Sequence, residues 1–282
     1  RDRIGIKPFY YLIQDEVFYF SSEIKALIPF LNTEKLEVNR KAITEYLIFQ
    51  YPISENTLID NIKILMPAHS ITVNNNNIKF NKYWELDYNN KIFYSNEEQY
   101  TKELKNIIDY SINIHLNSDV SIGSYASGGI DSTVVSILSS NKISKLFHGK
   151  FSEDPTCDES YYANLLSEKI NIPIHNYDMN CEDFINNIEK IIYHMDYPSA
   201  GVGVFPQYII SREVSKDFKV VLGGQGGDEI FGGYVRYIIP YFEDSIDKAM
   251  DNNPENLSKL LPNMNILKQY KPMLKTFFNS DM

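Results

Sequence analysis

The stretch Ser124–Val135 reads Ser-Tyr-Ala-Ser-Gly-Gly-Ile-Asp-Ser-Thr-Val-Val, and it decides the fold. Residues 122–126 predict a strand and residues 133–140 a helix, so that residues 127–132 form the loop between them. Two glycines allow a tight turn, and the N–H groups at the start of the helix suit a phosphate group. Asp131 stands where a phosphate-binding loop of the Walker type would place Lys-Ser or Lys-Thr. A carboxylate repels bare phosphate, so the loop is predicted to hold phosphate together with a cation such as Mg²⁺.

Strands and helices alternate after this loop. Further strands are expected at residues 145–151, 175–179 and 219–222, and helices at 159–170, 183–193 and 206–216. Such alternation predicts right-handed βαβ units and a parallel sheet, so the predicted fold class is α/β. Ligands bind such sheets at the carboxyl ends of the strands, which is where the loops after Ala126 and Leu222 lie.

The second loop, residues 223–233, holds six glycines among eleven residues. We attribute them to a backbone that passes close to a ligand, since glycine loses more entropy on folding than any other residue. Asp228 would supply a second carboxylate for the cation beside Asp131, whereas Glu229 is expected to act only as a helix N-terminal charge. The alternative for both loops is purely structural, as glycine turns capped by serine and aspartate at helix starts.

Composition excludes several classes of function. A net charge of −10 argues against binding nucleic acid, and no apolar run approaches the ~20 residues that a membrane span needs. Cys157 and Cys181 are too few for a disulfide framework, which favours the cytoplasm, and we expect both to be ordinary buried or partly buried thiols. The five histidines show no metal-ligand spacing, so structural or surface roles are expected for them.

The part of the chain before residue 90 has an α+β pattern. Hairpins are expected at residues 7–21 and 69–80, and a helix from an N-cap at Asn39 to about Gln50. Ser95–Glu98 fits a capping box that opens a further helix. We place domains at residues 1–88 and 89–282. The chain starts inside a structured pattern without an initiator methionine, so a fragment of a longer protein is expected.

Several motifs together resemble the asparagine synthetase (glutamine-hydrolysing) family. Residues 127–132 match its pyrophosphate loop S-G-G-x-D-S, and residues 221–234 resemble its second motif, which ends in D-E-[LI]-F-G-G-Y. Asp158-Glu159 with Tyr162-Ala163 is similar to its D-E-x-x-Y-A stretch. Residues 1–8 and 22–27 resemble the end of its glutaminase domain. The resemblance covers about residues 1–240, with no match evident past Tyr241.

The resemblance implies a nucleotide α-hydrolase-like (PP-loop) domain, preceded by the C-terminal part of a class II glutamine amidotransferase domain. It implies an ATP-dependent ligase that adenylates a carboxylate and aminates it with ammonia, releasing AMP and pyrophosphate. The implied pyrophosphate contacts are Ser127, Gly128, Gly129 and Ser132, and the implied Mg²⁺ ligands are Asp131 and Asp228. Implied nucleotide contacts are Gly223 and Gly224 and, by strand position, Tyr125, Ala126 and Lys150. Aspartate is the expected acceptor, and a homodimer is a candidate assembly.

Three departures from the family pattern leave alternatives open. The chain has no N-terminal cysteine nucleophile, so free ammonia is its expected nitrogen source. Gln225 stands where many members have a glutamate implicated in adenylation, and an amide can orient a substrate but cannot act as a base. Residues 199–204 replace the Thr-Thr-x-Arg of aspartate-using members. The alternatives are amidation of another carboxylate such as a sugar acid, or a non-catalytic nucleotide-binding fragment. An unrelated ligase that thiolates nucleic acid is disfavoured by net charge.

Overall fold

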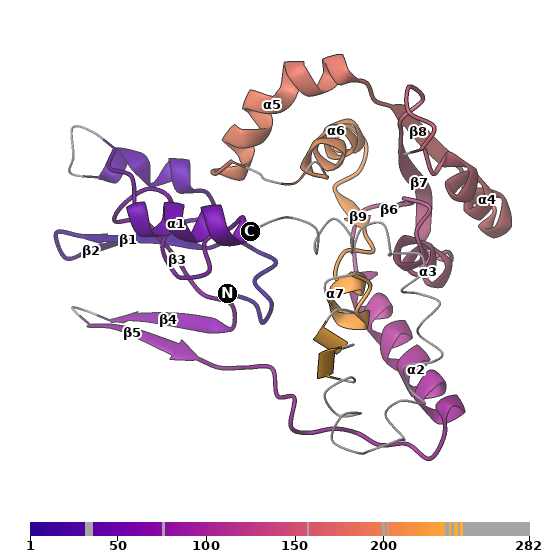
Figure 1. The fold of residues 1–282 in the computed structure, drawn as a ribbon, viewed down its shortest axis with the longest axis horizontal. Helices are drawn as coiled ribbons and strands as arrows, with labels where there is room; N and C mark the ends of the chain where they lie inside the picture. The colour runs from indigo at the N-terminus through magenta and orange to yellow at the C-terminus, as the bar shows by residue number, and fades with distance from the viewer. Residues whose placement is uncertain are drawn as a thin grey trace. The chain divides into compact units, whose positions relative to one another are not determined.

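The computed structural model describes residues 1–31, 36–74, 77–156, 158–198, 201, 203–234, 237, 240–241 and 243–244. They form two compact units (Figure 1). The first comprises residues 1–107, 151–153 and 178–216; the second comprises residues 108–150, 154–177 and those described from 217 on. No helix in these described ranges is long and apolar enough to cross a membrane.

A four-stranded sheet with the order β8-β7-β6-β9 lies at the centre of the second unit. Strand β6 (Ile122–Tyr125) pairs in parallel with both β7 (Ile143–Lys150) and β9 (Val220–Leu222), while β8 (Ile174–Asp178) lies outside β7. The first three residues of β6 are buried, as expected for a central strand covered on both faces. The α/β fold with a parallel sheet is therefore confirmed.

The helices of this unit bury the sheet. They are α3 (Ile130–Leu138), α4 (Ser160–Ile170) and the second half of α2 (Glu97–His115), whereas the short α7 (Gly227–Phe231) has no buried residue. Their shared core includes Ile112, Leu116, Ile122, Ala126, Leu146, Ala163 and Leu166. Leu146 of β7 and Ala163 of α4 are fully buried in this core. The strand that leads into the first glycine loop, β6, pairs with β7.

Two antiparallel sheets belong to the first unit. Strands β1 (Tyr10–Gln14), β2 (Val17–Ser21) and β3 (Lys63–Ile64) have the order β2-β1-β3, and β4 (His69–Asn74) pairs with β5 (Asn77–Lys82). Both predicted hairpins are confirmed, although residues 75 and 76 of the expected asparagine turn lie outside the described residues. Helix α1 (Arg40–Phe49) begins after Asn39, whose side chain accepts a hydrogen bond from the Ala42 N–H at 3.1 Å, as predicted.

Several predicted helix starts differ from the structure by one to three residues, most clearly at α3 and α2. Helix α3 begins at Ile130 and not Thr133, because Gly129 is its N-cap and accepts the Thr133 N–H at 3.1 Å. Helix α2 is capped by Asn96, which accepts from the Gln99 N–H at 2.9 Å. The predicted capping box from Ser95 to Glu98 is therefore displaced by one residue, since asparagine caps a helix as well as serine does.

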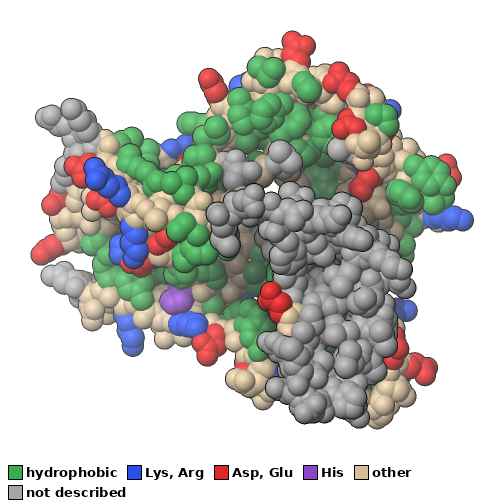
Figure 2. All heavy atoms as spheres, in the orientation of Figure 1, with side chains coloured by type: hydrophobic (Ala, Val, Ile, Leu, Met, Phe, Trp, Pro, Cys, Tyr) green, Lys and Arg blue, Asp and Glu red, His purple; other side chains and the backbone are tan. Residues whose placement is uncertain are grey.

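Helices α5 (Cys181–Met195) and α6 (Val204–Val214) pack on each other in the first unit, around Met179, Ile191, Phe205 and Ile209. Apolar side chains also gather on the outer surface over α5 (Figure 2), including the exposed Phe184, Ile185, Ile192 and Tyr193. Cys181 is exposed at the first position of α5, which corrects the expectation of a buried or partly buried thiol. Cys157 lies outside the described residues.

Replacing Asn180 with alanine should destabilise the first turn of α5 by about 1 kcal/mol. The Asn180 side chain accepts from the Asp183 N–H at 2.9 Å, and this bond would be lost, whereas the bond from the Asn180 backbone N–H to the Asp183 side chain at 3.2 Å can remain. Amide hydrogen exchange in the first turn should accelerate. Asn186→Ala, at an exposed position within α5, is the control and should leave that exchange unchanged or slower. Equal exchange in the two variants would contradict the capping role.

The Asp2 carboxylate closes the turn before β1. We expect this turn to loosen at acid pH, when the carboxylate is protonated. It accepts the backbone N–H groups of Lys7 at 3.0 Å and Ile6 at 2.9 Å, and these bonds lower the pKa of Asp2 from 3.8 to about 2. A depressed folded pKa means that this stabilisation is complete above pH 3.8 and is lost as the pH falls through about 2. The Lys7 amide resonance should titrate with a midpoint near 2 in NMR spectra. A Lys7 amide midpoint near pH 4 would contradict the lowered pKa of Asp2. The same titration of the Lys7 amide in the Asp2→Asn variant would show that Asp2 does not cause it.

Candidate active site

The two glycine loops start side by side. Strands β6 and β9 are parallel neighbours in register, with Gly123 opposite Val221 and Ser124 opposite Leu222. Each strand ends at the same edge of the sheet, so the loop after Ala126 and the loop after Leu222 leave together. The two motifs are far apart in the sequence, and they meet because β6 and β9 are neighbours in the sheet.

Contacts between the loops are close enough to explain two of the glycines. A Cβ at Gly224 would lie 2.6 Å from the backbone N of Ser132 and 2.8 Å from the backbone C of Asp131. A Cβ at Gly227 would collide with the Asp131 carboxyl group. Gly224 and Gly227 are needed because one loop lies directly against the other. From the sequence we attribute them to a backbone that passes close to a ligand, and the contact between the loops is the reason that the structure gives instead. Gly223 lies beside Tyr125, with 3.6 Å from its Cβ position to the ring.

The first loop is held by its own hydroxyl groups. The Oγ atoms of Ser127 and Ser132 are 2.9 Å apart, and Ser132 Oγ also donates to the Gly129 carbonyl at 3.1 Å. The Gly129 N–H donates weakly to Ser127 Oγ at 3.3 Å. Gly128 has φ +93°, a conformation that favours glycine. The four predicted pyrophosphate contacts thus form one short loop at the N-terminus of α3.

The two predicted metal ligands have different neighbours. The Asp131 carboxyl lies against Gly227, the residue before Asp228, whereas the Asp228 carboxyl lies against Gly233. Among the described residues, no group of three or more His, Cys, Asp and Glu side chains is arranged to hold a metal ion. Mg²⁺ usually takes one or two carboxylates and completes its shell with phosphate oxygens and water, so a pair of acids on converging loops fits it.

The remaining predicted residues are placed as follows. Gln225 is exposed, and its Oε1 is 2.7 Å from the Cβ position of Gly223. Ala126 is fully buried, and its N–H donates to the Phe147 carbonyl at 2.8 Å. Lys150 ends β7, and its charge helps to hold the pKa of Asp158 below its ordinary value, after the larger effect of the hydrogen bonds from Ser160. The positive charge of Lys150 therefore favours the ionised form of Asp158.

Sequence reasoning missed one polar group beside the loop. His148 lies on β7 and is only 2% exposed, and its Nδ1 is 2.7 Å from the Ala126 carbonyl oxygen. Its spacing to other histidines carried no signal. A histidine directly after the apolar pair Leu146-Phe147 was the available clue, because buried polar groups need hydrogen-bond partners.

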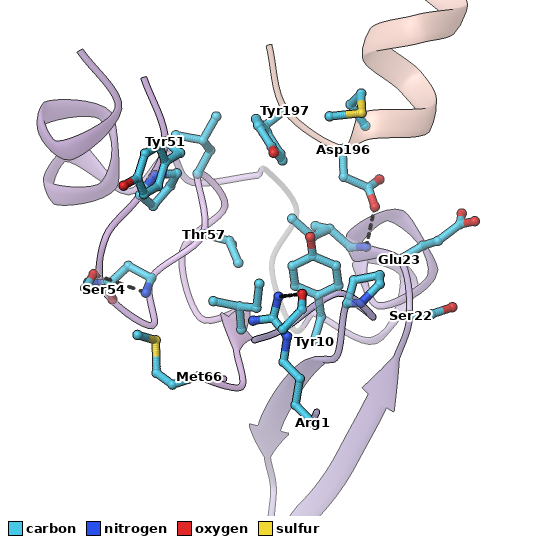
Figure 3. A pocket seen from close by; sticks show the side chains of 18 of the residues that line it. Arg1, Tyr10, Ser22, Glu23, Tyr51, Ser54, Thr57, Met66, Asp196 and Tyr197 are labelled. Carbon is cyan, nitrogen blue, oxygen red and sulfur yellow. Dashed lines mark hydrogen bonds between the residues drawn. The ribbon is translucent and has the colours of Figure 1, made fainter. Parts of the chain in front are cut away.

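A cavity of about 850 Å³ lies in the first unit, apart from every predicted site residue (Figure 3). Arg1 lines it, but the guanidinium group is occupied by backbone carbonyls. It donates to Gly5 at 2.7 Å, to Leu65 at 2.8 Å and to Lys7 at 2.9 Å. The Arg1 guanidinium therefore stabilises the backbone of the cavity wall.

Asp196, at the end of α5, lines this cavity together with Glu23 and is also bound by the protein (Figure 3). It accepts the Ile24 N–H at 2.8 Å and Lys25 Nζ at 2.9 Å. Burial lowers the pKa of Lys25, but hydrogen bonds to Glu23 and Asp196 outweigh it and raise the pKa above its ordinary value. Lys25 also donates to the Tyr193 carbonyl at 2.9 Å, so these groups join α5 to the segment after β2.

The parallel sheet with paired glycine loops at its carboxyl edge defines a nucleotide-binding domain of the PP-loop α-hydrolase class. Residues 103–278 match the family described as Asparagine synthase, so the match extends beyond the end near residue 240 that the motifs suggested. Residues 1–84 match the Glutamine amidotransferase domain. The chain belongs to the asparagine synthase family.

Individual relatives agree with this assignment. The chain is 31% identical over 268 residues to asparagine synthetase [glutamine-hydrolyzing] 1 of Bacillus subtilis, covering 93% of this chain and 40% of that protein. It is 32% identical over 259 residues to a putative asparagine synthetase 2 of Methanocaldococcus jannaschii, covering 88% and 49%. Amidase chyE of Penicillium rubens is 27% identical over 254 residues, covering 83% and 37%. The chain thus spans less than half the length of these relatives.

Proposed function

We propose that this chain is the ATP-using part of an amidotransferase that converts a carboxylate, with aspartate as the first candidate, into its amide. The observation that carries the proposal is the meeting of two glycine loops at the ends of adjacent parallel strands, with Asp131 of one loop against Gly227 of the other. Membership of the asparagine synthase family supports the same chemistry. The helix N-terminus behind the first loop suits the β and γ phosphates of ATP.

The reaction would proceed in two balanced steps. A carboxylate oxygen of the acceptor attacks the α phosphorus, the bond from that phosphorus to the bridging oxygen breaks, and pyrophosphate leaves. Ammonia then attacks the acyl carbon, AMP leaves with the bond electrons, and the nitrogen loses a proton. Ser127, Gly128, Gly129 and Ser132 would hold the departing pyrophosphate through N–H and hydroxyl groups. Gly223 and Gly224, with Tyr125 beside them, would flank the nucleoside.

Asp131 and Asp228 are the residues that would hold Mg²⁺. When bound, the ion would neutralise charge on the pyrophosphate as it departs. Gln225 would orient the acceptor through its amide, since it cannot remove a proton. We expect small-molecule partners only, a homodimer and a place in the cytoplasm.

Product analysis tests the proposal. The chain would be incubated with Mg-ATP, ammonia and a panel of carboxylic acids that includes aspartate and sugar acids. AMP and pyrophosphate formed with aspartate would support the asparagine-forming reaction. The same products with another acid would keep the mechanism and replace the acceptor. ADP and phosphate would refute adenylation, and Mg-ATP binding without turnover would leave a non-catalytic nucleotide-binding fragment.

A further inference from the structure

One buried polar side chain next to the loops has no part in the proposed chemistry. His148 is 2% exposed and makes two polar contacts. Its Nδ1 lies 2.7 Å from the carbonyl oxygen of Ala126, and its Nε2 lies 3.3 Å from Ser160 Oγ. A carbonyl oxygen can only accept, so Nδ1 carries a proton and donates it.

The first contact is made at the entrance of the first loop. Ala126 is the residue before Ser127, and its N–H already donates to the Phe147 carbonyl at 2.8 Å. With His148 on its carbonyl, both backbone groups of Ala126 are bound to β7. The point at which the chain leaves the sheet is therefore set by the side chain of His148 as well as by strand pairing.

The second contact is made at the helix on which the loop rests. Gly128 is pressed against the start of α4: a Cβ there would lie 2.9 Å from Glu159 Cβ and 3.0 Å from the Glu159 carbonyl oxygen. Ser160, the first residue of α4, donates both its N–H, at 3.0 Å, and its hydroxyl to Asp158, and its Oγ is also in contact with His148. Hydrogen bonds from Ser160 lower the pKa of Asp158, which keeps this acceptor ionised.

We propose that His148 is a positioning residue that sets the distance between the entrance of the pyrophosphate loop and the helix beneath it, by holding Ala126 and Ser160 at once. This inference deepens the proposed function and, for its ligand, rests on it. A loop whose N–H groups are held in place before binding loses less entropy when pyrophosphate arrives. A shift of about 1 Å in such a loop is enough to cost a large factor in affinity or rate.

Three variants separate the two contacts. His148→Leu removes both at similar volume, His148→Asn places an amide N–H near the position of Nδ1, and His148→Gln places one near Nε2. Calorimetry with inorganic pyrophosphate and Mg-ATP should give a dissociation constant raised about 10- to 100-fold in His148→Leu. His148→Asn, which keeps only the bond to Ala126, and His148→Gln, which keeps only the contact with Ser160, should each recover part of that loss. His175→Leu, which removes an exposed histidine of β8 in the same unit, is the matched control and should bind as the unaltered chain does.

Amide exchange of residues 127–132 without ligand gives a readout that does not depend on nucleotide binding. It should accelerate in His148→Leu and be intermediate in His148→Asn and His148→Gln. The inference would be overturned if the folded His148→Leu variant matched the unaltered chain in both loop exchange and ligand affinity. It would also be overturned if His148→Leu and His148→Asn lost the same amount of ligand affinity. If the unaltered chain bound neither ligand, the proposed function would fail, and the exchange data would still decide the role of His148. Should His148→Leu not fold, Ser160→Ala replaces it, with faster loop exchange expected.

Discussion

Asp131→Asn should lower the rate of AMP and pyrophosphate formation by about 1000-fold, the largest catalytic effect we expect in this chain. Asparagine keeps the size of the side chain that packs against Gly227, so the loops should remain in contact. It removes the negative charge that the proposed Mg²⁺ site needs at this position. A 1000-fold loss corresponds to about 4 kcal/mol of transition-state stabilisation. Steady-state assays of AMP release at several Mg²⁺ concentrations measure it.

Asp119→Asn is the matched control for this substitution. Asp119 is an exposed carboxylate in the loop between α2 and β6, outside the contacts of both glycine loops. Its loss changes net charge by the same amount and should leave the rate within a factor of about two. Turnover retained in Asp131→Asn would remove Asp131 from the metal site, whatever the effect of the control.

Gly224→Ala should both destabilise the second unit and prevent tight nucleotide binding. The added methyl group would lie 2.6 Å from the Ser132 backbone N and 2.8 Å from the Asp131 backbone C. Backbone atoms at a helix start cannot rotate away, so the two loops must separate. We expect a loss of about 2–3 kcal/mol in the free energy of unfolding, as for an overpacked core, and at least a 10-fold weaker affinity for Mg-ATP.

Gly203→Ala distinguishes this clash from a general effect of replacing glycine. Gly203 is the N-cap of α6 with φ −64°, and a Cβ there would have no neighbour within 4 Å. Its replacement should be neutral or slightly stabilising. Thermal unfolding and calorimetry compare the two variants. Equal stability and equal affinity in Gly224→Ala and Gly203→Ala would show that the loops do not approach as closely as the structure indicates.

The α/β fold could be predicted because its signals are local. Alternating apolar strands and amphipathic helices define βαβ units, and a parallel sheet follows from them. The same reasoning placed both glycine loops at strand ends. Helix starts were less accurate, as at α2 and α3, because neighbouring asparagine, serine and glycine residues cap a helix almost equally well.

The packing between distant segments could not be predicted. From motifs and composition, α5 and α6 are assigned to the predicted domain of residues 89–282. In the structure both helices belong to the first unit, where Asp196 at the end of α5 binds Lys25. The cavity beside Asp196 likewise has no sequence signature. Such contacts depend on which surfaces are buried together, and no periodicity along one segment specifies its partner.

At the candidate site, the apolar runs indicate which residues stand at the carboxyl ends of the strands, since a loop begins where an apolar run stops. The packed sheet is needed to show that β6 and β9 are neighbours, that Gly224 and Gly227 make room for Asp131 and Ser132, and that His148 binds Ala126. The physical reason is that strand order and register are set by burial of the whole sheet. Groups that are far apart in the chain reach hydrogen-bonding distance only after that burial is complete.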